Sequence, residues 1–557
     1  MAGPRRSLRL AFIAIAALIL YLPGLGRPAL WEPDEGRYAE IAREMHLSGD
    51  LITPRDNFVR YFEKPPLVYW IETAAVAALG TNEFAVRLPA ALFSAGSVVV
   101  TAAIAEAMVG EAAAALAAIA LALSPLFFGF ARFATLDPAL AFFITAALGA
   151  FYAAARSGDF AGGAGRRWFV ATAAMLALGT LTKGPVALVL GGAIALSWIL
   201  LERRGGEIAR MPWLSAIVVY CIIAVPWFVV VARRNPGFLH FFFIHEHLTR
   251  YVVTTEHGWG PWFFIPVVIG GTWPWIFFVP IGTRAMREDS ARHSALRFLA
   301  VWFIVIFVFF SIPRAKLGSY ILPALPALAI LAGIGMTRLW SLGAKQARWI
   351  LGWFAALNLA AAASAAAALF FLINRLNRPL LADGGIIAAL LAAMAILCFV
   401  FDRSGNRPGA AVITIILAMV LTMGIGTRAR EDSAGMATYR KLARQITPHL
   451  GPGCILGSYR HFVQSLPFYT GAREALISYR GELAPFGESP DAAASFIAND
   501  RALRELWGSG NCMVVVVNRK DLPGLETLNP APVIIGCEGK KLALSNRADA
   551  VGAAGCR

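Results

Sequence analysis

The segment WEPDEGRYAE (31–40) carries adjacent acids beside a base in a chain that is otherwise poor in charge. Asp34 and Glu35 can serve as a general base, as hydrogen-bond acceptors, or as groups that stabilise a developing positive charge. Arg37, and Lys64 from the stretch RYFEKPP (60–66), can give charge-assisted hydrogen bonds to phosphate oxygens. Such a mixture suits a substrate that has both an anionic group and polar hydroxyl or amino groups.

The composition identifies an integral membrane protein. Of the 557 residues, 58% are hydrophobic and only 15% are charged, and the mean hydropathy is +0.63. A membrane-spanning helix needs about 20 mostly apolar residues. The apolar runs predict thirteen spans, near 8–25, 84–108, 112–130, 137–155, 168–182, 185–201, 213–232, 261–282, 298–312, 319–337, 349–373, 380–401 and 409–427.

The distribution of basic residues predicts the orientation of these spans. We expect the first span, with its basic start at Arg5, Arg6 and Arg9, to be retained, and the N-terminus to be cytoplasmic. The inside loops then collect many arginines, as the positive-inside rule requires. This pattern explains much of the net charge of +16, so the charge gives no reason to expect nucleic-acid binding. The first outside loop (26–83) contains an apolar stretch at 65–79, which predicts an interfacial helix.

The chain after residue 427 has the composition of a soluble domain. Short β-rich runs near 454–459, 475–479, 512–518, 532–537 and 541–545 alternate with helical patterns near 436–450, 460–468 and 490–506. We therefore expect a transmembrane domain over 1–427 and a small α/β domain over 428–557 with a structural or docking role. Four cysteines lie in this tail, at positions 454, 512, 537 and 556. An odd number of spans puts them outside the cytoplasm, where one or two disulfides can form, with the pairing left open.

On this topology, charged residues gather at the outer membrane face. The first loop supplies Asp34, Glu35, Arg37, Glu63 and Lys64. Later outside loops add Arg132, Asp137, Lys183, Arg250, Arg314 and Lys316, together with several histidines. Charges close to hydrocarbon are costly, so a cluster of this kind favours a binding site for an anionic amphiphile, with phosphate on a lipid as the natural candidate.

Several motifs carry a family resemblance. The segments WEPDEGRYAEIAREM, RYFEKPPLVYW (60–70), LDPAL (136–140), LTKGP (181–185) and IPRAKLGSYILPALP (312–326) are similar to those of polyprenyl-phosphate-dependent membrane glycosyltransferases of the GT-C fold. The first two together resemble the lipid A 4-amino-4-deoxy-L-arabinose transferases, which are relatives of the protein O-mannosyltransferases. The resemblance covers roughly residues 8 to 340.

The resemblance implies an all-α polytopic membrane protein with about thirteen transmembrane helices in the GT-C fold and a small C-terminal α/β domain. It also implies an enzyme at the periplasmic face of the bacterial inner membrane. Such an enzyme moves aminoarabinose from undecaprenyl phosphate to a phosphate of lipid A, which gives resistance to polymyxin and other cationic peptides. The first-loop acid of the family is catalytic, and Asp34 matches it.

The remaining site residues are assigned by their place at the outer membrane face and by the substrate groups that they could bind. Lys64 is the leading ligand of the donor phosphate, and Arg250 and Tyr320 are further ligands. Asp137 and Glu35 are the other candidate catalytic residues, and either could receive the sugar ammonium. The other candidate substrate-binding residues are Arg37, Tyr38, Tyr61, Arg314 and Lys316. Structural alternatives remain open: the first-loop acids and Asp137 can cap helices, and the basic side chains can anchor to lipid headgroups.

No cofactor is required, although a divalent metal is one option. His245 and His247 would project to the same side of an extended strand and, with Glu63 or Glu246, could ligate a metal. The alternative is that these histidines form ordinary hydrogen bonds at the interface. Two other functions also remain open: transfer of a different lipid-linked sugar, such as mannose to protein hydroxyls, and transport of the lipid-linked sugar across the membrane.

Overall fold

The computed structural model describes residues 4–249, 258–342, 344–373, 378–403, 408–433, 437–487, 490–547 and 556. The chain forms two compact units. The membrane unit comprises Met1–Pro23 and Ala90–Asp432, and the loop–tail unit comprises Gly24–Pro89 and Ser433–Arg557. The first outside loop, expected from the sequence to belong to the transmembrane domain, thus folds together with the C-terminal tail.

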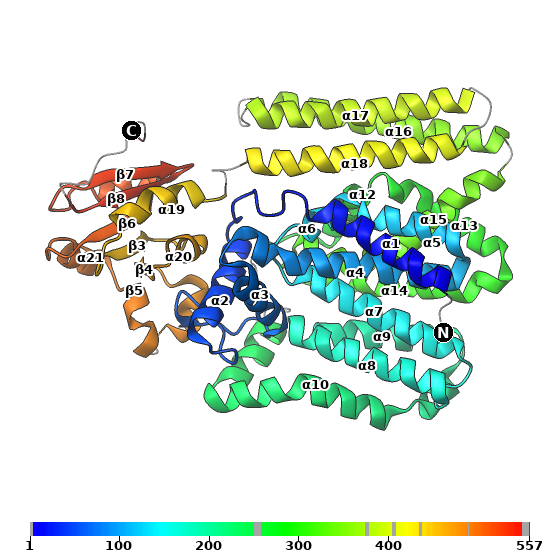
Figure 1. Ribbon diagram of the computed structural model, residues 1–557, viewed down its shortest axis with the longest axis horizontal. Helices are drawn as coiled ribbons and strands as arrows, with labels where there is room; N and C mark the ends of the chain where they lie inside the picture. The colour runs from blue at the N-terminus through cyan, green and yellow to red at the C-terminus, as the bar shows by residue number, and fades with distance from the viewer. Residues whose placement is uncertain are drawn as a thin grey trace. The chain divides into compact units, whose positions relative to one another are not determined.

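The membrane unit is built from helices (Figure 1). They are α1 (Pro4–Tyr21), α4 (Glu83–Val109), α5 (Glu111–Ala122), α6 (Pro125–Ala131), α7 (Asp137–Arg156), α8 (Gly163–Lys183), α9 (Val186–Leu201), α10 (Trp213–Arg234), η2 (His240–Thr249), α12 (Phe264–Gly271), α13 (Val279–Glu288), α14 (His293–Ser311), η6 (Gly318–Ala324), α15 (Leu325–Ser341), α16 (Ala344–Phe371), α17 (Arg378–Arg403) and α18 (Pro408–Asp432). Helix α4 begins in the loop–tail unit and continues into the membrane unit.

Every expected span falls on helix, which confirms a multi-pass membrane protein. Within the described ranges, eight helices are long and apolar enough to cross a membrane, or ten if each of two bent pairs forms one span. The bent pairs are α5 with α6, at 65°, and Pro261–Gly271 with Trp275–Glu288, at 96°. Helices α1, α8 and α9 fall outside that set, so the number thirteen stays a prediction.

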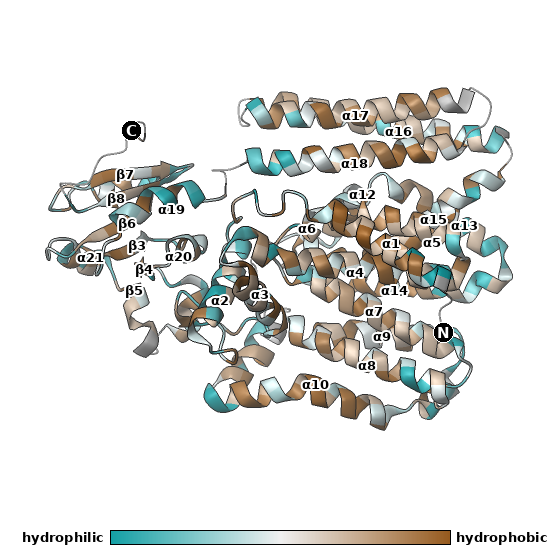
Figure 2. Cartoon of the chain, viewed as in Figure 1, coloured by the Kyte–Doolittle hydropathy of each residue, from teal (hydrophilic) through white to brown (hydrophobic). Residues whose placement is uncertain are grey.

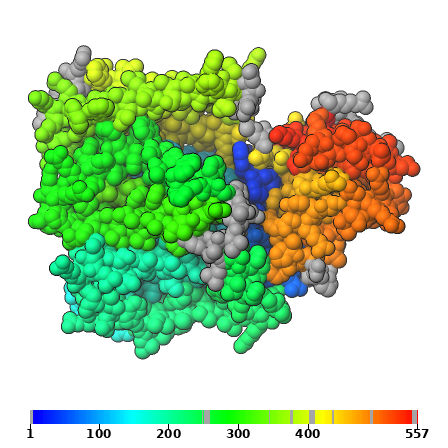
Figure 3. All heavy atoms as spheres, turned by 180° about the vertical axis from the view of Figure 1, so that it is seen from behind, coloured from blue at the N-terminus to red at the C-terminus, as the bar shows by residue number. Residues whose placement is uncertain are grey.

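Burial separates central helices from peripheral ones. The apolar windows of α7 and of Gly318–Leu339 are 78% and 89% buried, whereas those of α10 and α16 are each 22% buried. Figure 2 colours much of α10 and α16 as hydrophobic, and large apolar side chains of both helices are exposed, as expected for helices that face lipid. Trp198 of α9 packs edge-on against Phe298 of α14, with 5.3 Å between ring centroids. Figure 3 shows the cyan and green parts of the membrane unit packed against each other.

The loop part of the loop–tail unit contains α2 (Asp34–Ser48), a short hairpin of β1 (Arg55–Asp56) with β2 (Val59–Arg60), and α3 (Leu67–Leu79). Helix α3 coincides with the apolar stretch from which the sequence predicts an interfacial helix. Helix α2 packs against α3 and also against α20 (Ser465–Thr470) of the tail. The loop therefore has its own secondary structure and a folded partner.

The tail forms a six-stranded sheet in the order β5-β4-β3-β6-β8-β7. Its strands are β3 (Ile455–Tyr459), β4 (Glu474–Ile477), β5 (Phe496–Ile497), β6 (Met513–Asn518), β7 (Val533–Glu538) and β8 (Lys541–Ser545). Strands β3 to β6 pair in parallel, whereas β6, β8 and β7 pair antiparallel. The helices are α19 (Arg440–Ile446), α20 (Ser465–Thr470) and α21 (Asp500–Trp507). The α/β prediction and its five β-rich runs are confirmed, whereas β5 lies inside a stretch predicted to be helical.

The sheet is buried on both faces, which explains the continuous apolar run of β6. Val514 and Val516 pack in the cluster that includes α19 residues. Val515 and Val517 point to the opposite cluster, which includes Trp507 of α21. Two disulfides close this domain and settle the open pairing: they are Cys454–Cys512 and Cys537–Cys556.

Candidate active site

Helix α2 presents its charged sequence to the interior of the loop–tail unit. The residues from Glu35 to Met45 are all buried, although the helix contains many acids and bases. Burial of charge is tolerated only where each charge is paired. Arg43 and Glu40 pair in this way, through two hydrogen bonds of 2.6 and 2.7 Å. The helix is therefore fixed in orientation, and Asp34 stands at its first turn.

The carboxylate of Asp34 is held through one of its two oxygens. The Nη1 of Arg37 donates to its Oδ1 over 3.1 Å. This is the one hydrogen bond of the Asp34 carboxylate within the described part of the chain, and the side chain is 35% exposed. Arg37 gives its other donors to Glu482 of the tail, from Nε over 3.1 Å and from Nη2 over 2.5 Å. A carboxylate that is held by one hydrogen bond and stays partly exposed suits a group that acts on a bound substrate.

Glu35 lies in a different environment from its neighbour. It is fully buried, and Arg87 of α4 donates to both of its carboxylate oxygens over 2.7 and 2.8 Å. The backbone N–H of Trp31 donates to one of the same oxygens. Neither oxygen is open to a substrate, so the expectation that Glu35 is catalytic or receives the sugar ammonium is not supported. Its geometry is that of a structural ion pair.

The chain just before α2 is bound to the tail. The carboxylate of Glu32 accepts hydrogen bonds from the backbone N–H groups of Gln464 and Ser465, at 3.0 and 2.9 Å. Gly36 allows a close approach here, because a Cβ at this position would lie 2.6 Å from the backbone nitrogen of Ser465. Burial raises the pKa of Glu32 to about 7. The start of α2 is therefore set by contacts with the start of α20.

A second buried carboxyl, Glu474, lies at the start of β4 beside the loop. Its backbone exchanges hydrogen bonds with the side chain of Asn57, at 2.6 and 2.8 Å. Burial raises the pKa of Glu474 to about 8, so this side chain holds a proton at neutral pH. Nearby, burial lowers the pKa of Lys541 to about 8 and that of His461 to about 4. At the junction of loop and tail, burial thus shifts the pKa of each of these groups in the direction that favours its neutral form.

Lys64 and its neighbours belong to the same unit as Asp34. The Nζ of Lys64 donates to the backbone carbonyl of Glu63 over 3.0 Å and lies 3.7 Å from the Glu63 carboxylate. Both side chains are 15% exposed. The centroid of the Tyr61 ring lies 5.8 Å from the Arg37 guanidinium. The rings of Tyr38 and Tyr69 lie 5.9 Å apart. The structure thus gathers Lys64, Glu63, Tyr61, Tyr38 and Arg37 into the unit that contains Asp34.

The membrane unit contains a separate polar cluster. Asp137, the first residue of α7, accepts a hydrogen bond from the Nζ of Lys183 over 2.5 Å. That ammonium also lies 4.4 Å from the centroid of the Tyr320 ring. The structure therefore brings Asp137 and Tyr320 together through Lys183, which was not among the assigned site residues. The motif LTKGP contains Lys183, so the signal was present in the sequence.

The other basic candidates differ in how exposed their side chains are. Arg314 is exposed. Lys316 is 2% exposed, and its ammonium donates to the backbone carbonyls of Pro313 and Trp259. The contacts of Lys316 thus hold the backbone, and its assignment to phosphate binding stays a prediction. Arg250 lies outside the described residues.

The proposed metal ligands do not have the expected geometry. The segment His240–Thr249 is helical, so the expectation of an extended strand is wrong, because positions two apart on a helix point in different directions. His245 is exposed and stacks on Phe241, with 5.2 Å between the rings. The side chain of His247 lies outside the described residues. Among the residues that the structure does describe, no group of three or more His, Cys, Asp or Glu side chains could hold a metal.

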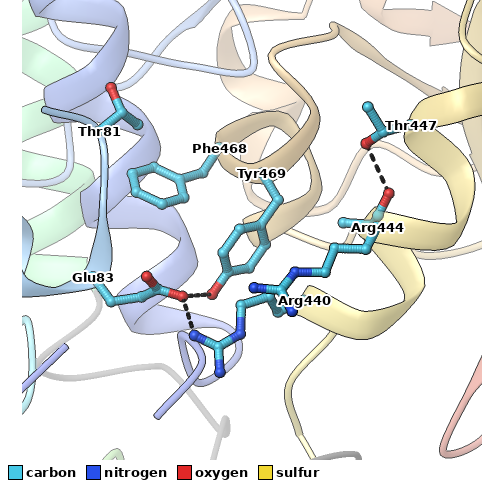
Figure 4. A pocket seen from close by; sticks show the side chains of 8 residues that line it. Thr81, Glu83, Arg440, Arg444, Thr447, Phe468 and Tyr469 are labelled. Carbon is cyan, nitrogen blue, oxygen red and sulfur yellow. Dashed lines mark hydrogen bonds and ion pairs between the residues drawn. The ribbon is translucent and has the colours of Figure 1, made fainter. Parts of the chain in front are cut away.

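Two basic cavities flank α19 in the loop–tail unit. The smaller, of about 200 Å³, contains Glu83, which accepts hydrogen bonds from Arg440 over 2.7 Å and from the hydroxyl of Tyr469 over 3.1 Å (Figure 4). The larger has a volume of about 550 Å³, and Arg440 and Arg444 line both cavities. Tyr469 also accepts from the backbone N–H of Leu30. No short sequence motif marks this network, since its members come from distant segments.

Comparison with known proteins extends these observations. A model of the dolichyl-phosphate-mannose-protein mannosyltransferase family matches residues 7–242. A protein of Erwinia tasmaniensis named "Undecaprenyl phosphate-alpha-4-amino-4-deoxy-L-arabinose arabinosyl transferase" is 33% identical over 389 residues, which cover 68% of each chain. A Pseudomonas fluorescens protein of the same name, numbered 1, is 34% identical over 58% of this chain. The alignments with the first three such relatives cover 55 to 58% of those proteins.

Solved structures give a match over nearly the whole length. The crystal structure of ArnT from Cupriavidus metallidurans bound to undecaprenyl phosphate is 30% identical, with a TM-score of 0.83, and the match covers 98% of this chain and 99% of that one. The apo structure of the same protein gives a TM-score of 0.85. These matches confirm the GT-C fold. The chain therefore belongs to the undecaprenyl phosphate-alpha-4-amino-4-deoxy-L-arabinose arabinosyl transferase family.

Proposed function

We propose that the protein transfers 4-amino-4-deoxy-L-arabinose from undecaprenyl phosphate to phosphate groups of lipid A. The observation that carries this proposal is the full-length correspondence with a structure solved in complex with undecaprenyl phosphate. The partners would be the lipid-linked aminosugar donor, the lipid A acceptor and the surrounding membrane lipids. In a bacterium, this modification would give resistance to polymyxin and related cationic peptides.

The reaction proposed is a single displacement at the anomeric carbon. An oxygen of the acceptor phosphate forms the new bond to this carbon, and undecaprenyl phosphate departs with the electron pair of the bond that breaks. A phosphate is already ionised at neutral pH, so no strong base is needed to create the nucleophile. Catalysis would come mainly from positioning and electrostatics.

In this scheme Asp34 is the catalytic residue. Its free oxygen would orient the acceptor, take a residual proton or stabilise the positive charge that develops on the sugar. The accessible carboxylate and its anchor through Arg37 support this role. Lys64 would bind the departing donor phosphate, which gains negative charge. Its ammonium is held beside Glu63 and remains partly exposed.

We assign the paired Asp137 and Lys183 to substrate binding, together with Tyr320. A lysine between a carboxylate and an aromatic ring can exchange its partner for a phosphate oxygen, which would release Asp137 to receive the sugar ammonium. Arg250 and Arg314 remain proposed phosphate ligands. Among the described residues, no metal cluster supports a metal-dependent step.

We place the site at the periplasmic face of the inner membrane. Two observations support this location: the arginine-rich loops on the opposite side of the predicted topology, and the two disulfides in the tail, a bond type that persists in oxidising compartments. The loop–tail unit, which contains Asp34 and Lys64, would then lie outside the cytoplasm.

The direct test is mass spectrometry of lipid A from cells with and without this chain. A gain of one or two aminopentose masses that depends on the chain is expected, and unmodified lipid A in a strain that makes the donor would contradict the proposal. Two alternatives predict other products. Transfer to protein hydroxyls would need a true base, so Asp34→Asn would abolish that transfer at every pH, whereas a phosphate acceptor would leave residual activity. A transporter would move the donor lipid without forming a new bond.

A further inference from the structure

The guanidinium of Arg37 is shared between two carboxylates from opposite ends of the chain. It bonds Asp34 through Nη1 and Glu482 through Nε and Nη2. The guanidinium is a planar fork, so a bidentate partner on one edge fixes the direction of the remaining N–H groups. The Arg37 side chain is only 10% exposed. Its orientation toward Asp34 is therefore set by Glu482 and not by solvent.

Glu482 is itself held in place by the tail and the loop. The side-chain amide of Gln464 donates to its Oε1 over 3.1 Å. Glu482 lies in the short helix η8 (Gly481–Phe486), and the ring of Phe486 packs edge-on against Phe62 of the loop at 5.0 Å. Gln464 also provides one of the backbone N–H groups that bind Glu32. The tail therefore binds the chain both before Asp34, at Glu32, and after it, at Arg37.

We infer that Glu482 is a positioning residue for sugar transfer, acting through Arg37 to leave one oxygen of Asp34 free for the substrate. The inference rests on the proposed function, since it assigns the tail a part in that reaction. With Nε and Nη2 bonded to Glu482, the guanidinium is oriented so that it bonds one oxygen of Asp34 through Nη1. Without Glu482, the same guanidinium can turn and bind Asp34 through both oxygens.

The inference predicts a specific kinetic effect of Glu482→Gln. The amide has the size of the carboxylate and can still accept one hydrogen bond from Arg37, so the fold should persist. It lacks the charge that competes with Asp34 for the guanidinium. We expect kcat to fall between about 10- and 100-fold, as is typical of a misplaced catalytic group, with the KM for the donor lipid changed less than about threefold.

The experiment uses the full-length protein in liposomes with the lipid-linked donor and lipid A, and product is measured by mass spectrometry. The matched control is Glu505→Gln, which removes a carboxylate of the same tail from an exposed pair with Arg501. Melting temperatures of both variants in detergent separate catalytic effects from unfolding. A second series repeats Glu482→Gln in an Arg37→Lys background, where bidentate bonding is already lost.

The expected result is a loss of kcat in Glu482→Gln alone, a melting temperature within a few degrees of the wild type, and little further loss when Arg37→Lys is present. A wild-type kcat in Glu482→Gln would overturn the inference. So would a loss in Glu482→Gln that multiplies with that of Arg37→Lys, because the two residues would then act independently. Failure of the wild-type protein to modify lipid A would instead refute the proposed function.

Discussion

The buried pair of Glu35 and Arg87 allows a quantitative test of how the first loop is held. Both side chains are fully buried, and they share two hydrogen bonds of 2.7 and 2.8 Å. Arg87 also donates to the backbone carbonyls of Leu25, Pro28 and Ala29. Glu35→Ala would leave the guanidinium charge in the interior without its counter-charge. Removing one partner of a buried pair typically costs about 3–5 kcal/mol.

For a folded unit of between about 150 and 250 residues, each kcal/mol lowers the melting temperature by about 2–4 °C. Glu35→Ala should therefore lower the melting temperature of the loop–tail unit by about 6 °C or more. Tryptophan fluorescence or differential scanning calorimetry of the protein in detergent can measure this. Glu505→Ala, which breaks an exposed pair, should change stability by less than about 1 kcal/mol. Equal melting temperatures for the two variants would refute the argument that the buried pair fixes the loop.

Three further outcomes follow from the loop–tail unit. Gly36→Ala should destabilise the unit by about 1–3 kcal/mol and reduce transfer, because its Cβ would lie 2.6 Å from the Ser465 nitrogen. Wild-type melting temperature and activity in this variant would show that the contact is dispensable. Burial raises the pKa of Glu474 to about 8, so its contribution to stability is present below the unfolded pKa and is lost as the pH rises toward 8. Thermal melts between pH 6.5 and 8 should show that loss, and Glu474→Gln should flatten it; an unchanged slope in Glu474→Gln would contradict the assignment. Replacing Cys454 and Cys512 by serine should lower the free energy of unfolding by about 2–5 kcal/mol, and reduction of the wild-type protein should produce a similar shift in a denaturant titration; no shift in either would mean that the bridge does not stabilise the unit.

The sequence predicts the membrane character and the tail well, for clear physical reasons. Spans and buried strands are long apolar runs, and each such run is a local property. The run CMVVVVN predicts the central strand because a strand covered on both faces needs apolar residues at every position. The acid at the start of α2 is also visible, since Asp34 follows a proline at a helix start near the first span.

The partners of the site residues could not be predicted from local patterns. Glu482 lies 445 positions from Arg37, and no spacing rule connects them. Asp34 and Glu35 look alike in sequence, yet one is partly exposed and the other is sealed by Arg87, a distinction that only packing creates. In sequence, Lys316 is a candidate phosphate ligand or headgroup anchor, but its ammonium donates to backbone carbonyl groups. The helical conformation of 240–249 also cannot be distinguished from a strand by the spacing of its histidines.

The participation of the tail follows from the same long-range contacts. A division at residue 427 reflects a change in composition, which marks where the membrane helices end. The compact unit instead joins residues 24–89 to residues 433–557. Charged residues of α2 find their partners in that unit. The C-terminal segment therefore forms its own sheet and also supports the candidate active site.

The most direct measurement is sugar transfer by reconstituted Asp34→Asn protein. Wild-type protein, Asp34→Asn and Glu505→Gln would be compared in liposomes with isotope-labelled lipid-linked aminoarabinose and lipid A. The labelled aminopentose should appear on lipid A with the wild type and with Glu505→Gln, whereas Asp34→Asn should be slower by at least about 100-fold, the usual cost of removing a group that acts on the transition state. Transfer by Asp34→Asn at the wild-type rate would contradict the account.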